Sequence, residues 1–353
     1  MYHNQSYAER PKVEQMIPNT ARARQPSAKD VALLAGVSTP TVSRVFSGSA
    51  NVSPRARRQV QAAAERLGYR PNSTARALAS GRVTTIAVIT QNTARYGNTT
   101  TIAGIEQAAR AAGHPMVISV LEGPDPQDIT RSLDAVLSQQ LAGAIVLQFD
   151  RAGRAALQAL PEDLPVVAVS GPNVPGRSQA VFEEARAGEE ATRYLLSLGH
   201  RSVAFIAFPS VGHVGGRVAG WRSALRSAGL NVPPVIQATW EARSSYEIGR
   251  SLARDPNTTA VFCANDMLAM GLISGLASAG RRVPDDISVI GFDDEPIAEF
   301  YLPPLTTVYQ DFAALGRDAF GLLKEHLDGS TRARLVRRTP TLVVRGSAGP
   351  PPG

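Results

Sequence analysis

The 353-residue chain has little of what metal enzymes and disulfide-bonded scaffolds require. Cys263 is its one cysteine, which excludes an internal disulfide, and its five histidines are scattered rather than paired at metal-ligand spacing. It also has no P-loop, no Gly-x-Ser-x-Gly and no Gly-x-Gly-x-x-Gly after an expected strand. We therefore expect no metal, no catalytic residue and no enzyme activity.

Long apolar runs are also missing. No stretch is long enough to cross a membrane, and the start MYHNQSYAERPKVEQMIPNT has no apolar segment of a signal peptide. We expect a cytoplasmic protein with no membrane partner, which disfavours a transport binding protein. Residues 1–26 and the end GSAGPPPG, residues 346–353, have the composition of a disordered basic arm and a disordered tail.

Positive charge is confined to one end of the chain. Residues 1–82 hold 13 of the 37 Lys and Arg residues but 4 of the 30 acidic residues, a net charge of +9. The other 271 residues carry a net charge of −2, so the whole excess of +7 comes from the first piece. Phosphate neutralisation dominates sequence-independent DNA affinity, so a polyanion partner is expected for this piece.

The segment Asp30–Phe46 has the pattern of two short helices around one glycine turn. Ser27 with Asp30 is a helix-start signal, Gly36 suits the positive φ of a tight turn, and Val42 and Val45 give the second helix a buried side. The outward positions of that second helix are Thr39, Pro40, Ser43 and Arg44. This is a helix-turn-helix pattern, although a helix corner alone does not establish DNA binding.

A third helix is expected over SPRARRQVQAAAERLGY, with Pro71 ending it. The next residues, 72–79, are too few to hold a helix in water, so we expect them to be ordered only with a partner. The motifs VSTPTVSRV and GYRPN-x-x-A-x-x-L resemble the DNA-binding headpiece and hinge of the LacI/GalR family of bacterial repressors. The resemblance implies a headpiece over 27–71 and a hinge over 72–82.

The same resemblance implies roles for particular residues on a palindromic, double-stranded operator bound by a homodimer. Base edges would be met by Thr39, Pro40 and Arg44, although Arg44 could equally contact phosphate. Phosphates would be held by Ser38, Thr41 and Ser43. In the minor groove, the hinge would bring Asn72, Ala75 and Leu78 to the DNA, with Leu78 wedged between bases or, alternatively, packed as a linker leucine.

Residues 83–345 alternate apolar, β-rich runs with amphipathic helical segments, which predicts parallel sheets covered by helices. This length exceeds what one core usually fills, so two lobes are expected, with crossings near residues 182 and 310. The expected fold is thus α/β: an all-α headpiece followed by a two-lobed effector domain. The family resemblance implies the same periplasmic-binding-protein-like architecture.

Ligands of such sheets bind at the carboxyl ends of the strands, where this chain gathers polar residues. The residues that follow or adjoin expected strand ends are Gln148, Asp150, Ser170, Asn265, Asp266, Asp293, Asp294, Arg217, Trp240, Gln310 and Phe312. Carboxylates, amides and an arginine around a tryptophan suit a pyranose. Asp266 and Asp294 could equally cap helices, and Phe312 could be core.

The runs VGGRVAGW, ANDMLAMG, SVIGFDD and PPLTTVYQDF resemble lac-type members of the family. That resemblance implies that Arg217, Asn265, Asp293 and Gln310 bind a sugar on which Trp240 and Phe182 pack. Gln148 and Ser170 stand where those members have asparagine and aspartate. The resemblance therefore implies a sugar ligand more firmly than it implies which sugar.

The sequence therefore predicts a repressor of sugar-utilisation genes that a galactoside or glucoside releases, with no cofactor besides this effector. A purine-like corepressor, or a sugar-binding protein without a regulatory role, is the alternative. The leucine-rich tetramerisation helix of lac-type members is missing after LVVRG, which favours a dimer.

Overall fold

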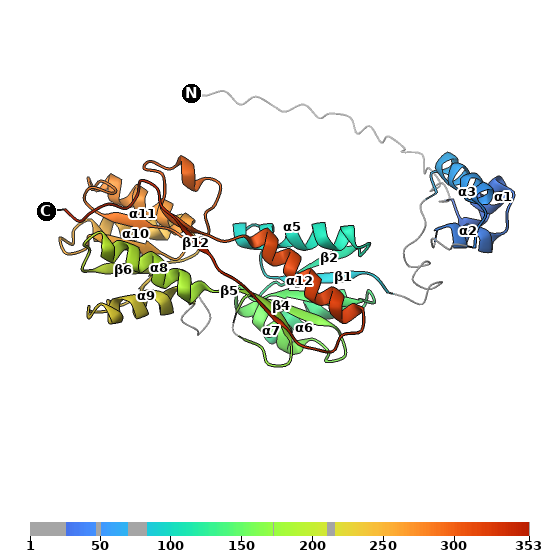
Figure 1. Cartoon of the computed structure of the whole chain (residues 1–353), viewed down its shortest axis with the longest axis horizontal. Helices are drawn as coiled ribbons and strands as arrows, with labels where there is room; N and C mark the ends of the chain where they lie inside the picture. The colour runs from blue at the N-terminus through green and yellow to red at the C-terminus, as the bar shows by residue number, and fades with distance from the viewer. Residues whose placement is uncertain (1–25, 47–50, 70–82, 172, 210–215, 353) are drawn as a thin grey trace, which may run out of the picture. The chain divides into compact units, whose positions relative to one another are not determined.

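The computed structural model describes residues 26–46, 51–69, 83–171, 173–209 and 216–352 (Figure 1). It divides into two compact units, Met1–Arg82 and Val83–Gly353. Nearly all of the expected basic arm and the whole of the expected hinge, with Asn72, Ala75 and Leu78, lie outside the described residues. Their expected roles therefore stay predictions.

Three helices form the headpiece: α1 (Ala28–Ala35), α2 (Thr39–Phe46) and α3 (Pro54–Leu67). The predicted start signal is a complete capping box, in which Ser27 and Asp30 hydrogen-bond each other's backbone N–H groups. Gly36 has φ +65°, as the turn requires. The small core comprises Val31, Ala32, Ala35, Val42, Val45, Val60, Ala63 and Ala64.

Lobe 1 of the second unit is a six-stranded, fully parallel sheet in the order β11-β5-β4-β3-β1-β2. Its strands are β1 (Ile86–Thr90), β2 (Met116–Val120), β3 (Gly143–Leu147), β4 (Val166–Val169), β5 (Ser178–Phe182) and β11 (Leu335–Arg338). Its helices are α5 (Tyr96–Ala111), α6 (Pro126–Leu137), α7 (Arg151–Ala159) and α12 (Phe312–Leu327).

Alternate residues of the lobe 1 strands pack on opposite helical layers. Ile86 and Val88 of β1 belong to the core under α5 and α12, whereas Ala87 and Ile89 belong to the core under α6 and α7. This period-two alternation with apolar residues on both faces explains why the strands appear as continuous apolar runs in the sequence.

Lobe 2 is a four-stranded parallel sheet in the order β7-β6-β8-β9. Its strands are β6 (Val203–Ala207), β7 (Ile236–Gln237), β8 (Ala260–Cys263) and β9 (Ser288–Ile290). Its helices are α8 (Glu184–Ser197), α9 (Gly216–Ser227), α10 (Ala242–Leu252), α11 (Asp266–Ser278) and the short η1 (Ala298–Phe300). The predicted α/β class with two lobes is confirmed.

The chain passes between the lobes three times. It leaves lobe 1 between β5 and α8, and it returns between β10 (Thr307–Tyr309) and α12, at the two places expected from the sequence. A third passage joins β11 to β12 (Thr341–Val343), which pairs antiparallel with β10. The sequence did not indicate this third passage, because β11 and β12 are short and half-exposed.

The expectation of a disordered tail over 346–353 is wrong for residues 346–352. Ser347 is fully buried beside β9 and is bonded twice to Val289: the Val289 N–H donates to the Ser347 carbonyl, and the Ser347 hydroxyl donates to the Val289 carbonyl. The N–H of Gly349 donates to the hydroxyl of Ser288, and its carbonyl accepts from the buried His200 ring. Hydrogen bonds between backbone groups and the side chains of Ser347, Ser288 and His200 hold this segment, and Ala348 packs against the lobe 2 core.

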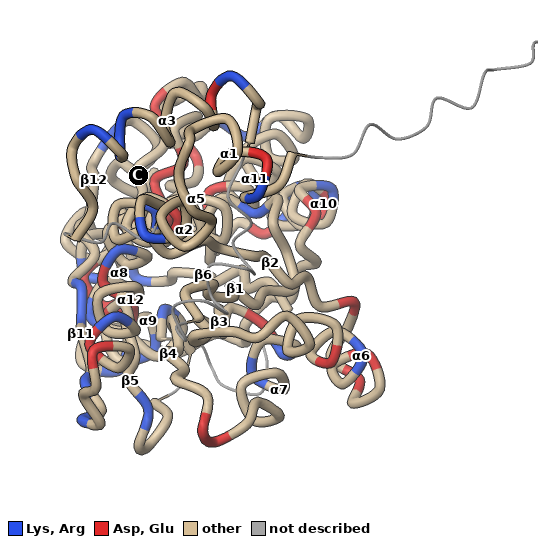
Figure 2. Tube along the Cα trace, turned by 90° about the vertical axis from the view of Figure 1, so that its right-hand side faces the viewer, with Lys and Arg blue, Asp and Glu red and all other residues tan. Residues whose placement is uncertain are grey.

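No helix within the described residues is both long and apolar enough to cross a membrane. On lobe 1, basic and acidic residues are interspersed along α12, and the charged residues of β11 are arginines (Figure 2). Several of them pair, as in Arg338 with Asp318 at 2.6 Å and Lys324 with Asp328 at 2.5 Å. The two signs of charge therefore offset each other along this part of the surface.

Candidate functional site

A cavity of about 470 Å³ lies between the two lobes, at the carboxyl ends of their strands. Seven of the eight predicted effector-binding residues line it: Gln148, Ser170, Phe182, Arg217, Trp240, Asn265 and Asp293. The eighth, Gln310, is buried and hydrogen-bonds Arg217 instead. The strand-end argument thus located the cavity, while the role of each residue toward a ligand stays a prediction.

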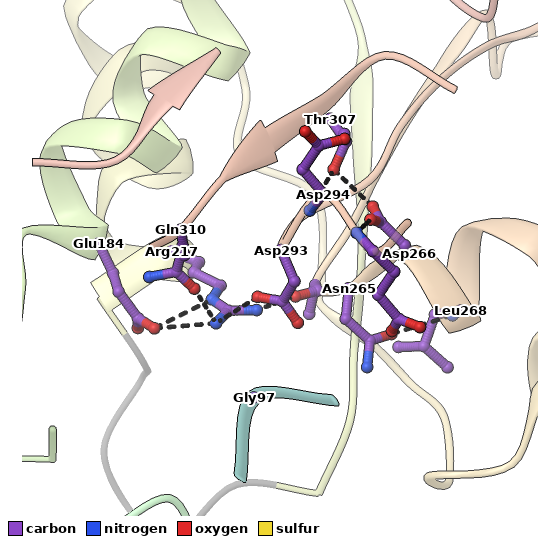
Figure 3. Close-up of polar contacts among 12 residues, drawn as sticks. Gly97, Glu184, Arg217, Asn265, Asp266, Leu268, Asp293, Asp294, Thr307 and Gln310 are labelled. Atoms are coloured by element: carbon purple, nitrogen blue, oxygen red, sulfur yellow. Dashed lines mark hydrogen bonds and ion pairs between the residues drawn. The ribbon is translucent and has the colours of Figure 1, made fainter. Parts of the chain in front are cut away.

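Arg217 is the centre of the lobe 2 wall (Figure 3). Its guanidinium donates to Glu184 Oε1 at 2.9 Å, to Gln310 Oε1 at 3.0 Å and to the carbonyl of Ala264, and it lies 3.1 Å from Asp293 Oδ1. Burial alone lowers the pKa of Arg217, but the charges of Asp293 and Glu184 outweigh this effect and raise it. Arg217 is therefore a permanently charged donor held in one orientation.

Close helix packing sets the position of Arg217. A Cβ on Gly188 would lie 2.4 Å from the carbonyl oxygen of Arg217, and one on Gly220 would lie 2.0 Å from that of Ala185. These two glycines allow the backbones of α8 and α9 to touch, which brings the first turn of α9 beside Glu184 on the first turn of α8. A larger residue at either position would separate Arg217 from Glu184.

Asp293 follows β9 in an unusual backbone conformation, with φ +104°. Such a φ is costly for a non-glycine residue and is found most often at binding sites. Burial raises the pKa of Asp293 to about 7, and the charge of Arg217 opposes this rise. Asp293 can therefore change its charge near neutral pH while it faces the cavity.

Asn265, rather than Asp266, caps helix α11, since its Oδ1 accepts from the N–H of Leu268 at 2.9 Å. Its amide Nδ2 is the group that remains for a ligand. Asp266 is fully buried and accepts from the Thr307 hydroxyl and from the N–H of Glu295. Burial raises its pKa well above the usual value. Its hydrogen bond with Glu295 supports the loop that carries Asp293.

The lobe 1 wall is less completely hydrogen-bonded. Gln148 Nε2 donates to the carbonyl of Ser170 at 3.2 Å, but the buried Oε1 of Gln148 has no partner among the described residues. A Cβ on Gly171 would come within 2.7 Å of Gln148, so the side chain is confined as well as buried. A buried acceptor without a donor is rare and points to a ligand that supplies one.

The sequence arguments missed several lining residues, among them Arg95, Tyr96, Phe208, Glu184 and Glu295. Arg95 and Tyr96 lie beyond the carboxyl end of β1, and Phe208 follows the end of β6, so the same strand-end rule would have found them. Asp294, by contrast, pairs with Arg345 at 2.7 Å and is not part of the lining.

The lining has more acidic than basic groups. The carboxylates are Asp150, Glu183, Glu184, Asp293 and Glu295, and the cations are Arg95, Arg154 and Arg217. Within the described residues, no group of three or more His, Cys, Asp or Glu side chains could hold a metal ion. Carboxylates therefore outnumber cations in the lining. Glu184 and Asp293 already pair with Arg217, whereas the buried Oε1 of Gln148 has no donor among the described residues.

In the headpiece, α2 buries Val42 and Val45, with 1% and 6% of their surface exposed. The opposite side of the helix exposes the side chains of Thr39, Pro40, Ser43 and Arg44, as expected. Ser38 Oγ and Thr41 Oγ1 are hydrogen-bonded to each other at 2.9 Å. A helix with this exposed polar side has the form required to enter a major groove.

Two family models match the chain: bacterial regulatory proteins of the lacI family over residues 27–72, and a periplasmic-binding-protein-like domain over residues 192–348. The ribose operon repressor of Escherichia coli K12 is 33% identical over 328 residues, covering 91% of this chain and 99% of that protein. The transcriptional repressor PurR of Photobacterium profundum is also 33% identical over 328 residues, covering 90% and 97%.

A crystal structure of the lac repressor dimer bound to operator and the anti-inducer ONPF matches with a TM-score of 0.84. It is 29% identical and covers 92% of this chain and all of that one. These similarities span the headpiece and both lobes, and the relatives are repressors rather than enzymes. The chain therefore belongs to the lacI family of bacterial regulatory proteins, and it is a DNA-binding transcriptional repressor.

Proposed function

We propose that this repressor responds to a neutral sugar, a galactoside or glucoside, that binds in the cavity between the lobes. The observation that carries the proposal is the excess of acceptors in the lining, together with the unpartnered Gln148 Oε1 among the described residues. A polyhydroxylated ligand brings several O–H donors at once, whereas a purine brings few. The excess of carboxylates disfavours an anionic ligand such as a sugar phosphate.

The lobe 2 wall would supply the oriented contacts. Arg217 and Asp293 present a donor and an acceptor side by side, which suits two adjacent hydroxyls, and Asn265 adds its amide. Aromatic rings, including Phe182, would cover the C–H face of the sugar. The name of the Escherichia coli relative, a ribose operon repressor, also supports a sugar.

We further propose that a homodimer binds a palindromic operator and that the sugar lowers its operator affinity. The similar lac repressor structure is that of a dimer bound to operator, which supports the dimer. Three chain passages join the lobes, so a ligand in the cavity can bias their relative rotation. By reciprocity, operator DNA must weaken sugar binding by the same factor that sugar weakens operator binding.

Titration calorimetry of the full chain against galactosides, glucosides, ribose and purine bases tests the effector, with and without a palindromic duplex. We expect heat from a neutral sugar and weaker sugar binding in the presence of the duplex. If only a purine base gave heat, and it bound more tightly in the presence of DNA, the effector would be a corepressor rather than an inducer. The similarity to PurR supports this second candidate.

A further inference from the structure

Trp240 is covered on both of its faces by side chains of this protein. The guanidinium carbon of Arg95 lies 3.6 Å from the centre of the Trp240 ring, and the Phe208 ring stacks on Trp240 with centroids 4.0 Å apart and planes 24° apart. Two groups at these distances would collide on one face. Arg95 and Phe208 therefore cover opposite faces of Trp240.

The two covers differ in origin. Phe208 and Trp240 both belong to lobe 2, where Phe208 packs against the lobe 2 core. Arg95 precedes α5 of lobe 1, so its contact with Trp240 spans the cavity. Its side chain is long, and although it occupies the N-cap position of α5 it makes no capping hydrogen bond to the described turn. Arg95 is thus the cover that can move away at low cost to the fold.

The contact with Trp240 removes water from the Arg95 guanidinium, and the nearby charge of Asp150 offsets only part of this cost. Burial lowers the pKa of Arg95, and the nearby Asp150 acts in the opposite sense. Burial likewise raises the pKa of Asp150. The Trp240 ring and the charge of Asp150 therefore both favour the charged guanidinium, and the attraction to Asp150 remains when another group takes the ring.

We propose that Arg95 is a built-in occupant of the Trp240 face, which a sugar must displace before its own C–H side can stack there. This inference rests on the proposed sugar site, and it identifies Arg95 as a residue that sets the sugar affinity of that site. Only the molecules in which Arg95 is displaced can bind the sugar. The apparent dissociation constant equals the intrinsic one divided by the fraction of such molecules, and it is therefore higher. A ligand without a flat face to offer Trp240 gains nothing from the displacement and is rejected.

Arg95→Ala should therefore bind the sugar about three- to tenfold more tightly than the natural chain, since the arginine–indole attraction no longer competes. Arg95→Lys keeps the charge without the planar group and should fall between the two. Arg110→Ala is the matched control, because Arg110 is an exposed arginine in the last turn of the same helix, α5, and does not line the cavity. It should leave both the sugar affinity and the exposure of Trp240 unchanged.

Acrylamide quenching of tryptophan fluorescence gives a second measurement that needs no ligand. Trp221 is fully buried, so quenching reports mainly on the half-buried Trp240. Quenching should increase in Arg95→Ala and stay constant in Arg110→Ala. Unchanged quenching in Arg95→Ala would overturn the proposal, and so would unchanged or weaker sugar binding by this variant. If quenching increased but no sugar bound, the conclusion that Arg95 covers Trp240 would stand and the proposed sugar site would be wrong.

Discussion

The headpiece and the effector unit present their functional groups in opposite ways. On α2 the expected DNA-reading side chains are exposed, and a core of eight small apolar residues supports the helix from behind. In the effector unit Asp293 and Gln310 are buried, and both contact Arg217, whose side chain is 11% exposed. A substitution on the exposed side of α2 should therefore change DNA binding without changing stability. A substitution among the buried residues of the effector unit should change both sugar binding and stability.

Arg217→Ala should give the largest effect of any single change considered. It leaves Glu184 and Asp293 without their common cation, so the free energy of unfolding should fall by about 3 kcal/mol. Sugar affinity should fall at least about a hundredfold, as when a buried charged pair is truncated. Chemical denaturation and calorimetry measure the two effects.

The control for this variant is Arg226→Ala, because Arg226 lies exposed in the last turn of the same helix, α9. It should change neither property. If Arg217→Ala lost sugar affinity without any loss of stability, the proposed link between binding and stability in the effector unit would be wrong.

Arg44→Ala tests the opposite expectation for the headpiece. Operator affinity should weaken about ten- to a hundredfold, because a good base contact is lost, while the thermal transition of the protein stays in place. Fluorescence anisotropy with the operator and with an unrelated duplex separates two roles. An equal loss on both duplexes, with a salt slope smaller by about one, would identify Arg44 as a phosphate contact.

The pH dependence of sugar affinity tests the buried site more finely. The pKa of Asp293 is raised to about 7, so below this pH the carboxyl is protonated in the ligand-free protein. A hydroxyl that donates to the carboxylate favours the charged form, so affinity should rise by up to about tenfold between pH 6 and 8 and then level off. Asp293→Asn should make the calorimetric profile flat.

The same shift has a consequence for stability with the opposite sign. A carboxyl pKa that is higher in the folded than in the unfolded state means that folding takes up a proton between about pH 4 and 7. The contribution of Asp293 to the unfolding free energy is therefore present at low pH and lost as the pH rises through 7. Asp266 has a raised pKa too, so part of this dependence should remain in Asp293→Asn.

Ser347→Ala should give the smallest effect on stability. Since Ser347 does not line the cavity, this variant tests whether stability and sugar binding are linked elsewhere in lobe 2. Its hydroxyl donates to Val289 and accepts from the N–H of Thr306, so its loss should cost about 1–2 kcal/mol of unfolding free energy. Sugar and operator affinities should not change. A change in sugar affinity would show that binding is linked to stability throughout lobe 2 rather than at the cavity alone.

Local signals in the sequence carried most of the fold and much of the site. Ser27, Asp30 and Gly36 act on neighbours within a few residues, so their pattern predicts the headpiece helices directly. Strand ends likewise indicate which polar residues gather, because carboxyl ends of parallel strands share one edge. The family resemblance added the assignment of Phe182, which no local pattern supplies.

The features that the sequence did not reveal depend on distant partners. Arg95 meets Trp240 across the cavity, and Gly349 accepts from His200, 149 positions earlier. The composition of residues 346–352 is that of a disordered tail, yet their backbone groups match free groups of β9 and its neighbours. Composition reports apolar content, whereas backbone pairing of this kind leaves almost no trace in it.

The segment 346–352, which the buried Ser347 anchors beside β9, also bears on the order in which the protein is assembled. Lobe 1 receives α12 and β11 only after both sheets have otherwise been synthesised, and lobe 2 is closed by Ser347 and Gly349 later still. The headpiece helices end at Leu67 and can fold as soon as they leave the ribosome. During translation the chain therefore carries a DNA-reading surface well before either lobe is complete, and a chain cut short before residue 346 lacks the hydrogen bonds that Ser347 and Gly349 make to lobe 2.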